Sequence, residues 1–596
     1  MTDSRRFELT VREKDGNLRR YRQRPADAGF LLSRQDVIDF VRRLIPRRRA
    51  RPLRSALALV WLLFPPLAAR AQLPPSPLED ATVLRPAAIR FGGFFDFASA
   101  TERFGENTPG RREGQHEPLL IDYTVNSLGV INLPRLATFE DDIRGASGLA
   151  SFDLSLGQPI VQSDVGIATL PISLEVGITS RLMVGFTVPY VKTRNTLSYD
   201  LTDGTVGINP GLVAGPARTA NTLFIDQITD ASGDLATALD FCSANPSSGI
   251  CPNLNANRAQ AEALIDESLV LRDQIERVYG SATATNPSPV VPRIGSAAQT
   301  AIDTRATTMS ALYRSLLGLP AEPITARPFG APTPVTGLQV QGIVRTDAEV
   351  FGIAARGLES SARSHVGDME AGAKLLVVDG LREGRGFRMA VAGAYRFATG
   401  REDDPDDFFD IPTGDGQNDI DVASFVDLGL GGRFILSARG RYTIQLPDET
   451  IARITDAPNQ ILPPAYRRQT VERDLGDIVE LEATPRFGIS RYFSVIGQYT
   501  FRRRGADDYT GQFTIPGSVT GIGDVDLDAS TLGLETESIE HRVGLGFTFS
   551  TLHAPRTRWP IEIGYLHGVT VDGTGNALSV TRDVIQIRIY TPGAVR

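Results

Sequence analysis

The feature that most constrains this chain is a repeated run of ten to thirteen residues in which apolar and polar side chains alternate. The run at residues 538–549, SIEHRVGLGFTF, shows it most clearly, and residues 434–446 and 479–487 repeat it. Successive side chains of a strand point to opposite faces, so this period of two indicates strands with one apolar and one polar face. The mature chain is therefore expected to fold mainly as sheet.

Twelve such strands can be placed. They are predicted at residues 87–98, 168–179, 182–194, 367–379, 386–398, 420–431, 434–446, 477–489, 492–504, 538–550, 559–571 and 580–591. Strands of about ten residues match a tilted crossing of the hydrocarbon layer, whereas strands of a soluble β-sandwich usually have five or six. Backbone groups in lipid must all be paired, so the predicted fold is an all-β, transmembrane antiparallel barrel of about twelve strands, within a range of ten to fourteen.

The connections between these strands alternate in length. Short turns at 180–181, 380–385, 432–433, around 491 and at 551–558 alternate with long polar ones such as 401–418, 447–476 and 505–537. Short turns inside the cell envelope and long loops outside are typical of outer-membrane barrels. An even number of strands then returns the C-terminus to the periplasm.

Residues 47–71, RRRARPLRSALALVWLLFPPLAARA, have the three-part order of a secretory signal, with cleavage expected after Ala71. The signal begins some fifty residues from Met1, which leaves two explanations: a start codon assigned too far upstream, or a genuine Arg-rich extension. We therefore divide the chain into residues 1–71 (extension and signal), a Pro-rich leader at 72–86, first strands at 87–201, an insertion at 202–366 and remaining strands at 367–596. The expected location is the cell outer membrane.

Charge argues against a nucleic-acid partner. After residue 71 the chain has 45 basic and 63 acidic residues, and this acidic balance would repel nucleic acid. Lysine occurs only at Lys14, Lys192 and Lys374, so the basic residues are almost all arginine. The partners expected instead are outer-membrane lipid, a small-molecule solute and, during biogenesis, the barrel assembly machinery.

Two regions depart from the alternation. In residues 99–167 we predict short strands near 119–131 and 150–157, and we interpret the region as a long loop, an inward hatch or an extra strand pair. The insertion at 202–366 has helical patterns at 257–280 and 297–318, and we expect an extracellular cap, a segment folded into the lumen or a partly disordered surface loop. Within it, Cys242 and Cys251 favour a disulfide over two free thiols in an exported protein.

The polar faces of the strands supply the candidate pore-lining residues. These are Glu175, Glu370, Lys374, Arg388, Arg396, Arg439, Arg441, Glu480, Glu482, Arg486, Arg502, Glu540, Arg542, Glu562 and Arg588. Charges of both signs are interleaved, so they either form a salt-bridge network that stiffens the wall or select solutes by charge. The acidic loop 401–415 lacks the spacing of a calcium loop and is interpreted as solvated.

The chain shows no recognisable catalytic motif. His541 is predicted to point outward from a strand, but no serine in a nucleophile motif accompanies it, and phosphate loops, dinucleotide fingerprints and metalloprotease motifs are absent from the sequence. We therefore predict that the protein is not an enzyme and has no catalytic residues, no cofactor and no metal site.

Residues 170–193, LPISLEVGITSRLMVGFTVPYVKT, resemble the strand-turn-strand signature of bacterial outer-membrane transporter-like barrels. The matching residues are Leu174, Glu175, Gly177, Ile178, Thr179, Arg181, Leu182, Val188, Pro189 and Tyr190. The resemblance is to the family associated with phenol-degradation pathways, which shares its plan with hydrophobic-compound uptake channels. It implies a porin-like channel for small, hydrophobic or aromatic solutes. The alternative is a non-conducting structural or adhesion barrel whose helical insertion binds an extracellular partner.

Overall fold

The computed structural model describes residues 8–12, 18–22, 79–106, 112–284, 286–345, 351–552 and 559–592. Its contacts divide the chain into two units, residues 1–64 and 65–596. In the first unit, β1 (Glu8–Arg12) pairs antiparallel with β2 (Leu18–Arg22). The signal expected at 47–71 and its cleavage site lie outside the described residues.

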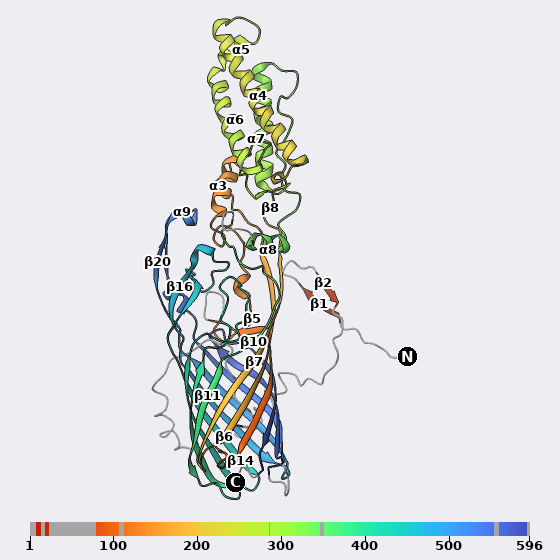
Figure 1. The fold of residues 1–596 in the computed structure, drawn as a ribbon. Helices are drawn as coiled ribbons and strands as arrows, with labels where there is room; N and C mark the ends of the chain where they lie inside the picture. Colours follow the sequence, from red (N-terminus) through yellow and green to blue (C-terminus); the bar gives the residue numbers. More distant parts are fainter. Residues whose placement is uncertain are drawn as a thin grey trace, which may run out of the picture. The chain divides into compact units, whose positions relative to one another are not determined.

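Twelve strands of the second unit close into an up-and-down antiparallel barrel (Figure 1). Each pairs with the barrel strands before and after it in sequence, and β24 pairs with β3 to close the ring. The strands are β3 (Ile89–Ala100), β6 (Pro159–Gly177), β7 (Leu182–Leu201), β11 (Met369–Asp379), β12 (Arg385–Phe397), β13 (Asp419–Gly431), β14 (Phe434–Gln445), β17 (Ile478–Gly488), β18 (Phe493–Arg504), β22 (Ser538–Ser550), β23 (Ile561–Thr574) and β24 (Thr581–Tyr590).

The predicted barrel and its twelve strands are confirmed. Most boundaries agree within a few residues, but β6 begins nine residues before the predicted start at 168, and β7 continues to Leu201 instead of ending at 194. The additional residues of β6 and β7 pair with each other, and β10 (Ser361–Val366) pairs with residues 190–195 of β7. The sheet therefore continues beyond the twelve-stranded ring.

Most of the large apolar residues of the barrel strands lie on the outer face. In β24, Ile585, Ile587 and Ile589 are 37–40% exposed, whereas the alternating Gln586 and Arg588 are at most 5% exposed. The outer face elsewhere carries Phe91, Phe95, Phe97, Leu174, Phe186, Tyr190, Leu375, Phe397, Val422, Leu481, Phe487, Tyr499, Leu545, Phe547 and Phe549. An outward-facing apolar band around a closed ring is the arrangement that lets strands contact hydrocarbon without unpaired backbone groups.

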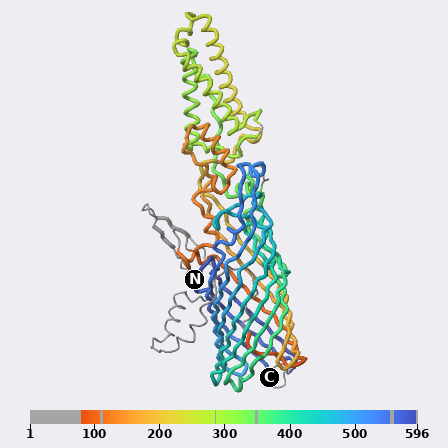
Figure 2. The backbone as a smooth tube through the Cα atoms, turned by 90° about the vertical axis from the view of Figure 1, so that its left-hand side faces the viewer, coloured from red at the N-terminus to blue at the C-terminus, as the bar shows by residue number. Residues whose placement is uncertain are grey.

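The long connections lie at one end of the barrel, together with the short link between β23 and β24, and the other short turns lie at the opposite end (Figure 2). The turn between β13 and β14 is the tightest: Gly431 and Gly432 both have positive φ values, 97° and 63°. Only glycine adopts such angles at little cost. The end of the last strand, β24, lies with the short turns.

The long connections carry small elements of their own. A three-stranded sheet contains β15 (Asp448–Arg453), β16 (Arg468–Asp474) and β19 (Asp508–Thr510), and a hairpin pairs β20 (Gln512–Ile515) with β21 (Val525–Asp528). Near them lie η3 (Ala465–Arg467), α9 (Gly517–Thr520) and η4 (Ala529–Gly533). Val471, Tyr509 and Leu527 belong to one hydrophobic cluster, so these connections fold together.

The insertion is more helical than predicted. The two predicted helices are present as α6 (Arg258–Tyr279) and α7 (Ala297–Leu317). Three further helices were not predicted: α4 (Pro216–Ala244), α5 (Cys251–Ala256) and α8 (Gly337–Arg345). The insertion also contains η2 (Pro210–Leu212) and the paired strands β8 (Val206–Ile208) and β9 (Val290–Pro292). Phe224, Ile228 and Leu235 of α4 are fully buried, so its missed apolar stripe holds the helices together.

The predicted strands near 119–131 and 150–157 are wrong. The region instead contains β4 (Glu102–Phe104), β5 (His116–Pro118), η1 (Ile121–Tyr123) and α3 (Leu136–Ser147), with one isolated bridge from Gly129 to Ser155. Its apolar residues join the hydrophobic core of the helical insertion, which explains why they do not form a sheet face. Among the described residues, no helix combines the length and apolar content needed to cross a membrane.

Candidate functional site in the barrel lumen

The described end of the Pro-rich leader, residues 79–86, lies inside the barrel. Ala81 and Leu84 are 0% and 1% exposed. Ala81 packs with inward-facing Ala390 and Phe425, and its backbone N–H donates to Asp427 Oδ2 at 3.1 Å. Leu84 packs with Met183 and Tyr590. The leader thus fills part of the lumen that the strands alone would leave open.

The leader is attached to the short-turn end of β6. The N–H of Ala87 donates to the carbonyl of Gly177 at 2.8 Å, and the N–H of Gly177 donates to the carbonyl of Ala88 at 2.9 Å. A Cβ at position 177 would lie 2.0 Å from the carbonyl oxygen of Arg85. Glycine is required here because the leader backbone approaches β6 so closely.

Two leader carboxylates extend among basic residues of the barrel wall. Glu79 Oε1 accepts from Lys374 Nζ at 2.7 Å, and Glu79 Oε2 accepts from an Arg588 guanidinium N–H at 3.0 Å. The next residue, Asp80, interacts electrostatically with Lys374 and Arg486. Glu79 and Asp80 could not be predicted as lumen residues because an irregular Pro-rich leader has no periodicity that assigns its side chains to a face.

Most predicted pore-lining residues form ion pairs across neighbouring strands. Arg396 contacts Asp419 at 2.5 Å and Asp421 at 2.9 Å, and Arg441 contacts Asp421 at 2.8 Å. The other ion pairs between strands are Arg439 with Glu480 and Glu482, Arg502 with Glu540, Arg388 with Asp379, and Glu175 with Arg90. Arg542 pairs with Glu540 of its own strand, and Glu562 accepts a hydrogen bond from the Tyr590 hydroxyl. The contacts show a salt-bridge network, and both the stiffening of the wall and the selection of solutes by charge stay predictions.

A cavity of about 220 Å³ remains beside the leader. Of the predicted residues, Glu175, Glu370, Lys374, Arg439, Arg441 and Arg588 border it. The lining also includes Glu79 and the apolar side chains of Phe94, Met183 and Phe425. The ammonium group of Lys374 lies 3.7 Å from the centroid of the Phe425 ring, a cation–π contact. The lining of the cavity therefore combines charged and apolar side chains.

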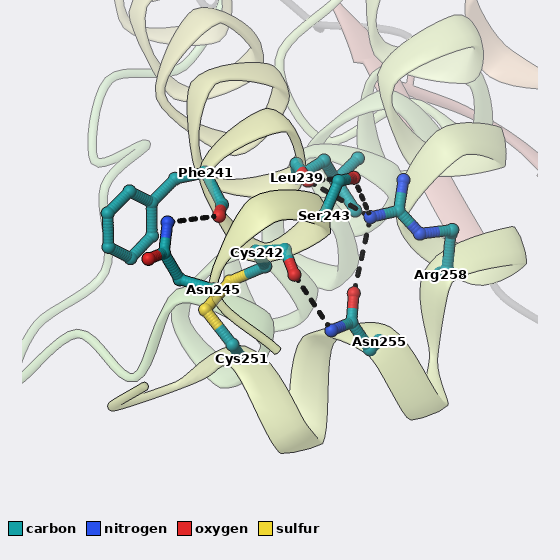
Figure 3. Close-up of a disulfide and its surroundings, with 8 residues drawn as sticks. All are labelled: Leu239, Phe241, Cys242, Ser243, Asn245, Cys251, Asn255 and Arg258. Atoms are coloured by element: carbon teal, nitrogen blue, oxygen red, sulfur yellow. Dashed lines mark hydrogen bonds between the residues drawn. A yellow bond between two sulfur atoms is a disulfide. The ribbon is translucent and has the colours of Figure 1, made fainter. Parts of the chain in front are cut away.

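The remaining sequence candidates lie outside the lumen. Cys242 and Cys251 are joined by a disulfide between α4 and α5, beside Arg258 at the start of α6 (Figure 3). In the acidic loop, carboxylates pair with arginines instead of gathering around one point: Asp404 contacts Arg356 at 2.9 Å, and Asp406 contacts Arg453 at 2.7 Å. The described residues contain no cluster suited to a metal ion.

Comparisons with known proteins return structures only. No protein-family model and no curated protein match the chain. An outer-membrane channel from Pseudomonas putida F1 is similar at 8% identity over 87% of this chain and 99% of its own, with a TM-score of 0.34. The toluene transporter TbuX from Ralstonia pickettii is similar at 9% identity over 86% and 90%, with a TM-score of 0.24. A FadL homologue from Pseudomonas aeruginosa is similar at 7% identity over 85% and 90%, with a TM-score of 0.25.

Proposed function

We propose that this chain is an outer-membrane channel for small hydrophobic or aromatic solutes. The observation that carries the proposal is the polarity of the closed barrel: its outer face is apolar and its inner face charged. A barrel that folds in water would instead need an apolar inner face, because its apolar side chains must leave the solvent. Hydrocarbon around the ring and water within it account for both faces at once.

The same proposal places the chain in its envelope. Export would follow the signal at 47–71, with cleavage after Ala71 and insertion by the barrel assembly machinery. The short-turn end would face the periplasm, and the helical insertion would lie outside the cell. The lumen leader would then enter from the periplasmic side, since it is attached to β6 at the short-turn end.

The mixed lining of the cavity supports the solute class. Phe94, Met183 and Phe425 offer apolar contact, and the wall charges are held by one another, which leaves the wall stiff. Small-molecule sites commonly combine such apolar walls with a few placed polar groups. A small aromatic solute fits this chemistry better than a large polar one.

Filling the cavity tests the proposal. Ala392 of β12 borders it, so Ala392→Trp should obstruct the lumen, whereas Val422→Trp on the outer face, 51% exposed, should not. Bacteria that produce either variant or the unchanged chain are given labelled benzyl alcohol, and its uptake rate is measured. We expect faster uptake with the unchanged chain and with Val422→Trp, and loss of that gain with Ala392→Trp. Equal uptake in all strains and in cells without the chain would refute a channel.

A second candidate is an adhesion barrel whose helical insertion binds an extracellular partner. It is favoured by the insertion itself, which has a hydrophobic core and a disulfide and exposes Phe241 to 54% next to Cys242. This candidate predicts no uptake or conductance with the full chain and conductance only after the insertion is deleted. Uptake by the full chain decides against it.

A further inference from the structure

Glu79 differs from the paired carboxylates of the strands because it belongs to the leader and not to the wall. Arg441 pairs with Asp421, and Arg582 pairs with Asp96, in both cases from a barrel strand to a barrel strand. Lys374 of β11 instead pairs with a carboxylate of the leader. Arg588 of β24 contacts the other oxygen of the same carboxylate. One tethered carboxylate thus bridges basic groups from two strands.

We propose that Lys374 and Arg588 form a binding site for the carboxylate of a solute, and that Glu79 occupies this site in the absence of that solute. The inference rests on the proposed channel function and adds that the solute carries a negatively charged carboxylate. The side chains of Lys374 and Arg588 are only 5% and 6% exposed. A buried cation without a carboxylate partner is costly in free energy. We therefore expect Glu79 to leave Lys374 and Arg588 only when the carboxylate of a solute replaces it.

The surroundings of the site define the rest of the ligand. The ring of Phe425 lies against Lys374, and Phe94 and Met183 line the same cavity of about 220 Å³. A carboxylate attached to a small aromatic or aliphatic body would contact both the basic groups and the apolar walls. Benzoate has this chemistry, and benzyl alcohol provides a body of similar size without the charge.

The leader can release Glu79 without leaving the barrel. Its attachment points follow Glu79 in sequence: the N–H of Ala81 on Asp427, the packed side chain of Leu84, and the backbone bonds of Ala87 and Ala88 to Gly177. Displacement of the Glu79 side chain therefore leaves these anchors in place. Glu79 acts as an internal competitor, and its removal should strengthen the binding of carboxylates alone.

Calorimetry on the purified full chain in detergent tests this inference with benzoate and benzyl alcohol as probes. Glu79→Gln should bind benzoate at least tenfold more tightly than the unchanged chain, with unchanged binding of benzyl alcohol. Adding Lys374→Met to Glu79→Gln should abolish the gain. Asp427→Asn weakens a different leader contact, the hydrogen bond from the Ala81 N–H, and should not increase the affinity for benzoate. Equal gains for both probes, or none for benzoate, would overturn the inference.

The unchanged chain provides a second measurement should Glu79→Gln fail to fold. Saturating benzoate should accelerate hydrogen exchange at the amides of Glu79 and Asp80, which precede the anchor at Ala81, because the Glu79 contacts are lost, and benzyl alcohol should not. Identical exchange with the two probes would count against the site. The uptake experiment tests the channel proposal separately. If the chain is not a channel, it does not increase the uptake of benzyl alcohol by cells, whatever the purified chain does with benzoate.

Discussion

The barrel and the helical insertion place the same residue types in opposite positions. Leu545 of β22 points outward and is 68% exposed, whereas Leu271 of α6 is fully buried among the insertion helices. In the barrel the charged residues are inside, and in the insertion the apolar residues are inside. Burial from water drives both arrangements, but lipid covers the barrel residues and protein covers those of the insertion. The surrounding solvent, more than the residue, decides which face is apolar.

The buried side of this comparison gives the largest expected effect. Leu271 and Val270 are neighbours on α6, but Leu271 is 0% and Val270 is 53% exposed. Leu271→Ala leaves a cavity and should destabilise the insertion by about 2–5 kcal/mol, whereas Val270→Ala should change it by less than about 1 kcal/mol. Thermal loss of the helical circular-dichroism signal in the full chain measures both. Equal losses would mean that α6 has no inner face.

A charge on the exposed side is the complementary test. Leu545→Arg puts a charge on the outer face about halfway along β22 and should cost about 2–4 kcal/mol if that face contacts the bilayer core. Leu338→Arg in α8 alters an even more exposed leucine, at 77%, and should cost less than about 0.5 kcal/mol. Urea titration of folding into lipid vesicles measures the difference. A barrel that tolerates Leu545→Arg as well as Leu338→Arg would not have its outer face in lipid.

The strands could be predicted from the sequence because each one repeats the same physical requirement. A lipid-facing strand must alternate over its whole length, so the pattern at 538–549 identifies β22 without knowledge of its neighbours. The inward direction of Arg396 and Glu480 followed from the same alternation. Strand order brings their partners close: Arg396 lies opposite Asp419, with which it pairs, and Glu480 lies diagonally from its partner Arg439.

Contacts without a period could not be predicted in this way. Glu79 reaches Lys374 across 295 positions of sequence, and nothing local marks it as a lumen residue. Helix α4 was missed because threonine, glycine and aspartate dilute its apolar stripe, although Phe224, Ile228, Leu235 and Leu239 follow a helical spacing. In residues 119–131, apolar side chains pack on helices that come later in the chain, and a local pattern cannot reveal that choice of partner.

Removal of the disulfide tests the comparison because it should destabilise the insertion and leave the barrel unchanged. Cys242 and Cys251 close a short loop between α4 and α5 (Figure 3). Opening a loop of this length should destabilise the insertion by about 2–3 kcal/mol, mainly by freeing the unfolded chain. The double variant Cys242→Ser/Cys251→Ser should therefore lower the temperature at which the helical signal is lost. The heat-dependent gel shift of the barrel should not change, and a barrel that opened with the disulfide would show that the two regions unfold as one.

The smallest effect is expected in the loop that begins after β4. This loop lies neither on the outer face of the barrel nor in the core of the helical insertion. Burial, together with the nearby carboxylates of Glu535 and Glu113, raises the pKa of Glu106 to about 7 from an ordinary value of 4.5. The neutral form is favoured in the folded chain, so the stability it provides is complete below about pH 4.5 and is lost as the pH rises through about 7.

Hydrogen exchange at Gly105 and Gly114, whose N–H groups donate to the carbonyls of Gln115 and Gly105, measures this local stability. After correction for the intrinsic rate, protection should decline between pH 5 and 8 in the unchanged chain and stay constant in Glu106→Gln. Glu449→Gln, an exposed substitution in β15, should leave the decline in place. A decline of the same size in Glu106→Gln would assign it to another group, and the loop would then respond to pH independently of the carboxylate buried there.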